Sequence, residues 1–343
     1  MKKTVWAFVV IGVLLSCRNT PKNEEKAPEV NVYTHRHYPP DQELFAQFEK
    51  ETGIKVNVVN ASADELIQKM QLEGPASPAD VLITVDAGRL VRAKEKGLLQ
   101  SIKSPFLDSI VPPHLQDDDQ QWFALTKRAR VIAYAKDRIA PGQLSTYENL
   151  ASDSWKNKLL IRSSSNIYNQ SLMASLIAHL GEEKAKAWAK KIVGNMARTP
   201  KGNDRDQVKA VVAGEGDLAI VNTYYVGRMI NSDDPVESKA GEGVGIYFPN
   251  QQGRGTHINI SGAGVAKHAP NKENAIKFIE FLASGEAQSV FAEANFEYPV
   301  NPNVKPAPLL QEWGSFKEDT LPLSQLGTNN KAAVLLFDEI GWQ

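Results

Sequence analysis

Cysteine is almost absent from this sequence of 343 residues, because Cys17 is the only one. A single cysteine excludes an internal disulfide and a cysteine-rich metal site. An excess of one charge is absent too, since 39 lysines and arginines stand against 40 aspartates and glutamates, with no long basic cluster. This balance argues against a nucleic acid as the partner.

A long apolar run is also lacking, since the apolar N-terminal segment 5–15 is too short to span a bilayer. Two lysines precede it, which is the layout of a secretory signal. The letters LLSC that end at Cys17 resemble the bacterial lipobox, in which the cysteine is lipidated and becomes the first residue. We therefore predict a lipoprotein signal peptide at residues 1–16; a plain signal peptide with an incidental cysteine is the alternative.

Residues 17–29 are polar and charged, contain proline and offer nothing to bury. Such a composition predicts a flexible tether between a lipid anchor and a folded domain. The protein is expected on the periplasmic or extracytoplasmic face of a membrane, held there by acyl chains on Cys17.

From residue 30 onward, short apolar runs alternate with amphipathic segments. Strands are expected at residues 30–33, 54–59 and 80–84, and helices at 41–51, 63–73 and 87–96. This alternation predicts an α/β fold with a mostly parallel sheet flanked by helices, and the length allows two domains. Ligands of such sheets bind at the carboxyl ends of the strands.

Later in the chain we expect further strands at residues 122–125, 131–134, 217–221, 258–260 and 262–266. Two glycines in the last of these suggest a close backbone approach or a bend. The polar segment 126–130 is expected where the chain crosses between two lobes. Its Arg128 and Arg130 can serve either as ion pairs that bridge the lobes or as residues of a cleft.

The first candidate site is Arg36-His37-Tyr38, which directly follows the first expected strand. A loop at that position is where an open α/β sheet holds its ligand. Pro39 and Pro40 would keep the backbone extended behind it. For His37, a solvated loop histidine is the alternative.

The second candidate is the segment 163–170, SSSNIYNQ, which opens a helix after a strand and contains Tyr168. Free backbone N–H groups at a helix start can hold an anion or orient a ligand. Simple N-capping by serine or asparagine explains the same letters.

The third candidate is Tyr224-Tyr225 with Arg228, after the expected strand at 217–221. Neighbouring strand residues point to opposite faces, so two phenols reach one centre only if the backbone turns, and Asn222-Thr223 supply turn chemistry. A core tyrosine beside an exposed one is the other interpretation.

Tyrosines at three strand ends are unusual for a sugar or peptide pocket. Phenolate oxygens suit a hard, highly charged cation, although binding requires them to lose their protons. Four phenolates on Fe³⁺ leave a charge of −1, which the Arg228 guanidinium would neutralise without binding the metal itself.

These segments resemble the ferric-iron-binding proteins of bacterial iron-uptake ABC transporters, particularly the subgroup of cyanobacteria and their relatives. The resemblance covers residues 30–343. It is carried by the segments RHYPPD, SPADVLITVDAGRL, WFALTKRARVIAYAKD, LSTYENLA, IRSSSNIYNQSL, GNDRDQV, GEGDLAIVNTYYVGR and FPNQQGRGTHINISGAGVAKHAPN.

The resemblance implies a type II periplasmic-binding-protein fold whose two lobes close on Fe³⁺, the transported ligand. The N-terminal lobe would comprise residues 30–126 and 262–305, and the C-terminal lobe 127–261 and 306–343. The implied ligands are His37, Tyr38, Tyr168, Tyr224 and Tyr225. With up to five protein donors, no obligatory anion is expected.

The function implied is capture of ferric iron by a monomer and its delivery to an ABC permease, without enzymatic activity. No nucleophile paired with a base and no cofactor motif occurs. A binding protein for a small organic or anionic solute is one alternative. A secreted metalloenzyme is another, although it would need an open coordination position for water.

Overall fold

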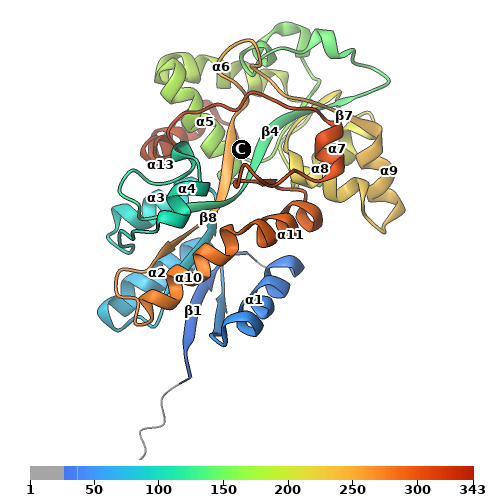
Figure 1. Ribbon diagram of the computed structural model, residues 1–343. Helices are drawn as coiled ribbons and strands as arrows, with labels where there is room; N and C mark the ends of the chain where they lie inside the picture. Colours follow the sequence, from blue (N-terminus) through green and yellow to red (C-terminus); the bar gives the residue numbers. More distant parts are fainter. Residues whose placement is uncertain (1–26, 37) are drawn as a thin grey trace, which may run out of the picture.

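The computed structural model describes residues 27–36 and 38–343 (Figure 1). The predicted signal peptide, the lipidation site Cys17, most of the predicted tether and the candidate ligand His37 lie outside the described residues. Within the described part of the chain, no helix is long and apolar enough to cross a membrane.

The strands are β1 (Glu29–Thr34), β2 (Lys55–Asn60), β3 (Val81–Val85), β4 (Phe123–Ala135), β5 (Leu159–Leu160), β6 (Leu218–Asn222), β7 (Val244–Tyr247), β8 (Ile258–Val265) and β9 (Tyr298–Pro299). The helices are α1 (Pro39–Thr52), α2 (Ala63–Glu73), α3 (Ala87–Glu95), α4 (Pro105–Ile110), α5 (Ile167–Leu180), α6 (Glu182–Asn195), α7 (Asp204–Val212), α8 (Thr223–Ile230), α9 (Pro235–Gly243), α10 (Lys272–Ala283), α11 (Gly285–Asn295), α12 (Pro308–Glu312), α13 (Ser324–Thr328) and α14 (Asn330–Ile340).

The strands form a mixed sheet in the order β2-β1-β3-β8-β4-β6-β5, with β7 and β9 also paired to β4. Pairing is parallel between β1 and its neighbours β2 and β3, and between β5 and β6. The pairs of β8 with β3 and of β4 with its partners are antiparallel. The expected α/β fold is confirmed, but the sheet is mixed rather than mostly parallel. Among the described residues, three of its eight strand pairs are parallel, because β4 and β8 run antiparallel to their neighbours.

Strand β4 connects the two ends of this sheet. Its first half pairs with β8 and β9, and its second half, from Arg130, pairs with β6 and β7. The prediction of two separate strands at residues 122–125 and 131–134 is therefore wrong. The polar segment between them stays extended and largely buried because its side chains find buried partners, such as Ser261 for Arg128.

Strand β8 is likewise continuous, where two strands at 258–260 and 262–266 were expected. The expected close backbone approach at its glycines is confirmed. A Cβ at Gly262 would lie 2.7 Å from the carbonyl oxygen of Phe123, and one at Gly264 would lie 2.5 Å from that of Gln121. Only a residue without a side chain lets β4 and the segment before it pack this tightly.

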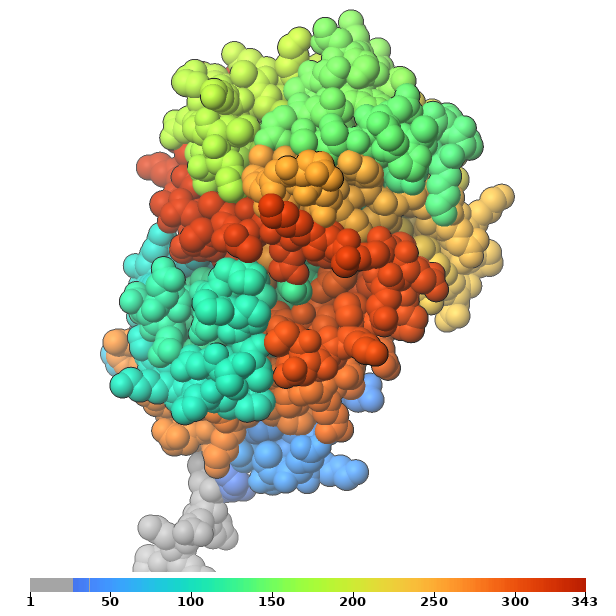
Figure 2. All heavy atoms as spheres, turned by 45° about the horizontal axis from the view of Figure 1, so that its top comes forward, coloured from blue at the N-terminus to red at the C-terminus, as the bar shows by residue number. Residues whose placement is uncertain are grey.

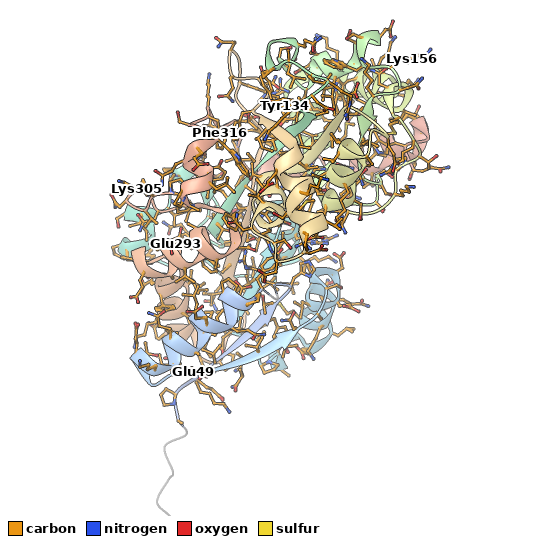
Figure 3. All side chains as sticks on the ribbon, turned by 90° about the vertical axis from the view of Figure 1, so that its right-hand side faces the viewer. Glu49, Tyr134, Lys156, Glu293, Lys305 and Phe316 are labelled. Atoms are coloured by element: carbon orange, nitrogen blue, oxygen red, sulfur yellow. The ribbon has the colours of Figure 1, made fainter. Side chains whose placement is uncertain are left out.

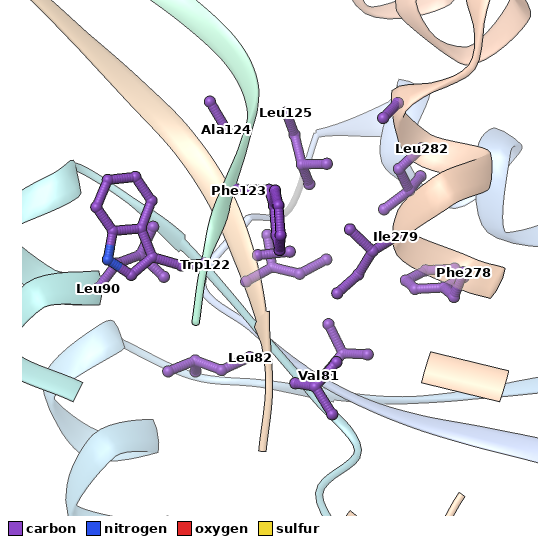
Figure 4. Close-up of a cluster of buried hydrophobic side chains, with 14 of the residues drawn as sticks. Val81, Leu82, Leu90, Trp122, Phe123, Ala124, Leu125, Phe278, Ile279 and Leu282 are labelled. Atoms are coloured by element: carbon purple, nitrogen blue, oxygen red, sulfur yellow. The ribbon is translucent and has the colours of Figure 1, made fainter. Parts of the chain in front are cut away.

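Each end of the sheet has its own hydrophobic core. Around β1, β3 and β8, helices α1, α10 and α11 cover one face and α2 and α3 the other. Figure 4 shows Phe278, Ile279 and Leu282 of α10 against Val81 of β3 and Phe123 of β4. Burying each such side chain contributes about 1.5–3 kcal/mol.

Around β6 and the second half of β4, helices α5, α6 and α14 cover one face and α7, α8 and α9 the other. The molecule is elongated: Glu49 lies near one end and Lys156 near the other, with Tyr134 on the Lys156 side (Figure 3). The C-terminal residues, red in Figure 2, lie across the middle of the molecule between the two ends. Among them, α13 packs against both α3 and α5.

Candidate metal centre

Four tyrosines from three helix starts meet between the two cores. Tyr38 is the N-cap residue of α1, Tyr168 lies in the first turn of α5, and Tyr224 and Tyr225 lie in the first turn of α8. The phenol oxygens of Tyr168 and Tyr224 are 3.2 Å apart. The structure thus brings together all four tyrosines that the sequence singled out.

The change of direction expected at Asn222-Thr223 is the start of a helix. Strand β6 ends at Asn222, and α8 begins at the next residue. Successive helical residues are about 100° apart, rather than on opposite faces as in a strand, so adjacent side chains can serve one site. The rings of Tyr224 and Tyr225 stack with their centroids 4.2 Å apart.

Two guanidinium groups lie against the ring of Tyr38. Arg36 lies 5.1 Å from its ring centroid and Arg228 lies 5.2 Å from it, both at cation–π distance. Arg228 comes from α8, in the region that carries Tyr224, and also donates to Asn295 Oδ1 at 3.4 Å. Arg228 therefore lies next to the tyrosines, as expected.

Three further arginines surround the ring of Tyr168. The guanidinium carbons of Arg128, Arg130 and Arg162 lie 5.7, 5.9 and 5.6 Å from its centroid. Of the two interpretations of Arg128 and Arg130, the cleft role is the one that the geometry supports. The alternating order of Thr126, Arg128 and Arg130 in one strand is the sequence signal that could have placed them on one face.

Buried carboxylates hold several of these arginines. Asp204 accepts from Arg130 Nη1 at 2.8 Å and from Arg162 Nη1 at 3.4 Å, and also from the backbone N–H of Asn222 at 2.8 Å. It thereby links the guanidinium groups beside Tyr168 to the end of β6.

Arg36 is held in the same way by Asp41 at 2.9 Å and Glu297 at 3.1 Å. Burial alone would raise the pKa of Glu297, but the charges of Arg36 and Arg128 outweigh it and lower that pKa. Glu297 is therefore an anion at neutral pH, and its pair with Arg36 is a buried ion pair.

Burial dominates the protonation of the phenols themselves. It raises the pKa of Tyr224 well above the ordinary value, and the neighbouring phenols Tyr168 and Tyr38 raise it further. Burial also raises the pKa of Tyr168, as does Tyr225, while Arg128 opposes the increase. Without a cation in the site, these phenols are neutral, so only a strongly charged ion would displace their protons.

The site has more hydrogen-bond donors than acceptors. Among the described residues, buried Arg128 Nε and Nη2, Arg130 Nε and Asn222 Nδ2 have no hydrogen-bond partner. The described residues also contain no group of three or more histidines, cysteines or carboxylates placed to hold a metal ion. A site of phenols among arginines suits anionic oxygen ligands on a hard cation.

The segment 163–166 in front of Tyr168 is a capping segment. Asn166 Oδ1 accepts from the backbone N–H of Tyr168 at 3.1 Å, and Ser163 and Ser165 bond to each other. The capping interpretation of this segment is confirmed.

A mixed α/β sheet with a core at each end and polar side chains converging between the cores is the architecture of a two-lobed binding protein. The chain belongs to the family of bacterial extracellular solute-binding proteins, whose family model matches residues 33–289.

Two curated relatives are similar over nearly the whole chain. Iron uptake protein A1 of Synechocystis is 50% identical, with 98% of this chain and 95% of that protein covered. Iron uptake protein A2 of the same organism is 48% identical, with 98% and 97% covered.

Two solved structures are also similar to this chain over most of its length. A Trichodesmium protein, IdiA (FutA), in complex with iron and citrate ligands, superposes with a TM-score of 0.89 at 52% identity, covering 92% of this chain and 100% of that one. The ferric binding protein from Campylobacter jejuni has a TM-score of 0.87 at 45% identity, with the same coverage.

Proposed function

We propose that this protein captures ferric iron outside the cytoplasm and delivers it to an ABC permease. The proximity of four tyrosines at the starts of α1, α5 and α8 carries this proposal. The similar proteins named for iron uptake and ferric iron binding support it.

The ligands of this proposal are the phenolates of Tyr38, Tyr168, Tyr224 and Tyr225, with His37 as a fifth donor. Phenolate oxygens are hard donors that favour Fe³⁺ over softer and less charged ions. Because burial makes deprotonation unfavourable, the ion must offset a large cost of proton removal, which a trivalent cation does better than a divalent one.

The surrounding charges match this ligand set. Five arginines lie against the tyrosine rings, namely Arg36, Arg128, Arg130, Arg162 and Arg228. Four buried carboxylates accompany them, namely Asp41, Asp86, Asp204 and Glu297.

Fe³⁺ with four phenolates carries −1, whereas Fe²⁺ with four phenolates carries −2. Because an uncompensated buried charge is costly, the ferric site needs less compensation from the arginines that lie against the tyrosine rings.

Lobe closure would bring the ligands together. In the proposed division, residues 30–126 and 262–305 form the lobe that carries Tyr38, and 127–261 and 306–343 form the lobe that carries the other three tyrosines. The protein would act as a monomer, held to a membrane by lipid on Cys17. Affinity then depends on the relative position of the lobes as well as on the ligands.

Titration of the metal-free protein with ferric citrate tests the proposal. A visible phenolate-to-iron charge-transfer band should grow and saturate at one iron per protein. A protein that stays colourless with ferric citrate would contradict the proposal.

A receptor for an anionic organic solute is the second candidate, because the arginines and their unpartnered donors favour such a ligand. Calorimetric titration with iron-free citrate separates the two. Binding of citrate without iron, together with absence of the band, would support the organic solute.

A further inference from the structure

Asp86 connects β3 to α3 with an unusual backbone. Its φ is 86° and its ψ is 122°, a conformation that residues other than glycine rarely adopt. Its side chain is completely buried. A strained residue with a buried carboxylate persists only where its surroundings hold it firmly in place.

On one side, Asp86 is fixed to β8. Its Oδ2 accepts from Asn259 Nδ2 at 2.8 Å, and its backbone N–H donates to the carbonyl of Ile260 at 2.8 Å. Asn259 Oδ1 in turn accepts from the backbone N–H of Ala87 at 2.9 Å. The turn from β3 into α3 is thus locked onto the sheet that carries the first core.

Gly88 makes room for this carboxylate. Its backbone N–H donates to Asp86 Oδ1 at 2.9 Å. A Cβ on Gly88 would lie 3.2 Å from the same oxygen and 3.5 Å from the carbonyl of Leu326 in α13. The carboxylate is therefore enclosed by β8 and by the start of α3. A third element, which belongs to the other core, contacts it from the opposite side.

That element is α5. The hydroxyl of Ser171 lies 2.9 and 2.8 Å from the two carboxylate oxygens of Asp86. Ser171 is fully buried and lies one helical turn after Tyr168. A single carboxylate therefore ties the helix start that carries Tyr168 to the end of β3, across the boundary between the two cores.

We propose that Asp86 is a positioning residue that sets, through Ser171, where Tyr168 lies relative to the region that carries Tyr38. This hydrogen bond is shielded from water, which strengthens it. Burial raises the pKa of Asp86, whereas the charge of Arg128 and the hydroxyl of Ser171 lower it. Without this hydrogen bond, the first turn of α5 can shift against β3, and the spacing of the phenols loosens. The inference rests on the proposed iron site.

The test compares Ser171→Ala with Ser175→Ala. Ser175 lies one turn further along α5 and is equally buried, but its hydroxyl donates only to the carbonyl of Leu172 in its own helix, at 2.8 Å. Both variants lose one buried hydroxyl, whereas only the first loses the bond to Asp86.

Two measurements are made on each full-length variant. Iron release to excess EDTA is followed through the charge-transfer band. Hydrogen–deuterium exchange of the metal-free proteins reports the opening of the first turn of α5.

Ser171→Ala should release iron about tenfold faster than the wild type, the effect of losing one buried hydrogen bond. It should also broaden the band and speed exchange at residues 168–171. Ser175→Ala should leave the rate of iron release, the width of the band and the exchange rates unchanged. Equal behaviour of the two variants would overturn the inference. If the wild type takes up no iron, the proposed function fails. Unchanged hydrogen–deuterium exchange in Ser171→Ala would refute the Asp86–Ser171 tie, whether or not the protein binds iron.

Discussion

The phenol oxygens of Tyr168 and Tyr224 lie 3.2 Å apart, although 56 positions separate the residues in the chain. Each phenol sits at the start of a different helix, so their proximity depends on how α5 and α8 pack, not on local sequence. With both phenols neutral, one can donate to the other, and a cation that displaces their protons would find two oxygens already placed together.

Replacing Tyr224 by phenylalanine should remove one oxygen ligand while keeping the ring. The variant is expected to bind iron at least about tenfold more weakly, because it loses a charged donor in a buried site. Its charge-transfer band should also be displaced. Spectrophotometric competition with citrate measures both. Tyr134→Phe, on the far part of β4, is the matched control, and equal affinity in the two variants would count against Tyr224 as a ligand.

Asp204→Asn should destabilise the fold, because two guanidinium groups lose a buried counter-charge. Breaking one side of such a buried pair costs about 3–5 kcal/mol in the free energy of unfolding. Urea denaturation of the metal-free protein measures it. On the same helix, Asp206 accepts only from the backbone N–H of Asn203 near the surface, so Asp206→Asn should cost about 1 kcal/mol. Similar costs for both variants would contradict this account of Asp204.

Gly227→Ala should also be destabilising, by about 1–3 kcal/mol, because an added methyl group would overpack the contact between α8 and Phe296. A Cβ on this residue of α8 would lie 2.6 Å from the Cβ of Phe296. Gly194 in α6 has nothing within 4 Å of such a Cβ, so Gly194→Ala should be neutral or slightly stabilising. Thermal unfolding of the two variants checks the contrast, which fails if Gly227→Ala is as stable as the wild type.

Buried His257 should make the protein less stable in mild acid. Burial, together with the charges of Arg130 and Arg128, lowers the pKa of His257 to about 3. The unfolded chain takes up this proton near its ordinary pKa of about 6.5, but the folded chain does not. Stability is therefore fully present above pH 6.5 and falls by about 1.4 kcal/mol per pH unit on acidification, until the folded pKa is reached.

Urea denaturation between pH 7 and 5 measures this slope, in a range where carboxylates contribute little. His257→Asn, which cannot take up the proton, should have a flatter dependence whatever its absolute stability. An identical slope in the variant would show that His257 titrates equally in both states.

The sequence predicts the regularly patterned parts of this fold well. The first strands and helices follow their expected ranges to within a few residues, because apolar periodicity determines which face is buried. The tyrosines were found because each follows a strand, where an α/β sheet places its ligands. Local sequence patterns were therefore sufficient to predict the first strands and helices and to single out the tyrosines.

The arginines and Asp86 could not be placed in the same way. Charged residues inside β4 suggested a break between strands, because the partners that make their burial possible are distant in sequence. Asp204 is 74 positions from Arg130, and Ser261 is 133 positions from Arg128. The tie between Asp86 and Ser171 spans 85 positions and has no local signal.

Strand β4 also restricts how this chain can vary in length. Arg128 and Arg130 lie on one face of the strand, against Tyr168, and Thr126 follows the same alternation and accepts from Arg36. Deleting a single residue between Thr126 and Arg130 would turn one part of this face to the opposite side of the sheet. We therefore expect relatives to tolerate substitutions in this strand more readily than a one-residue insertion or deletion.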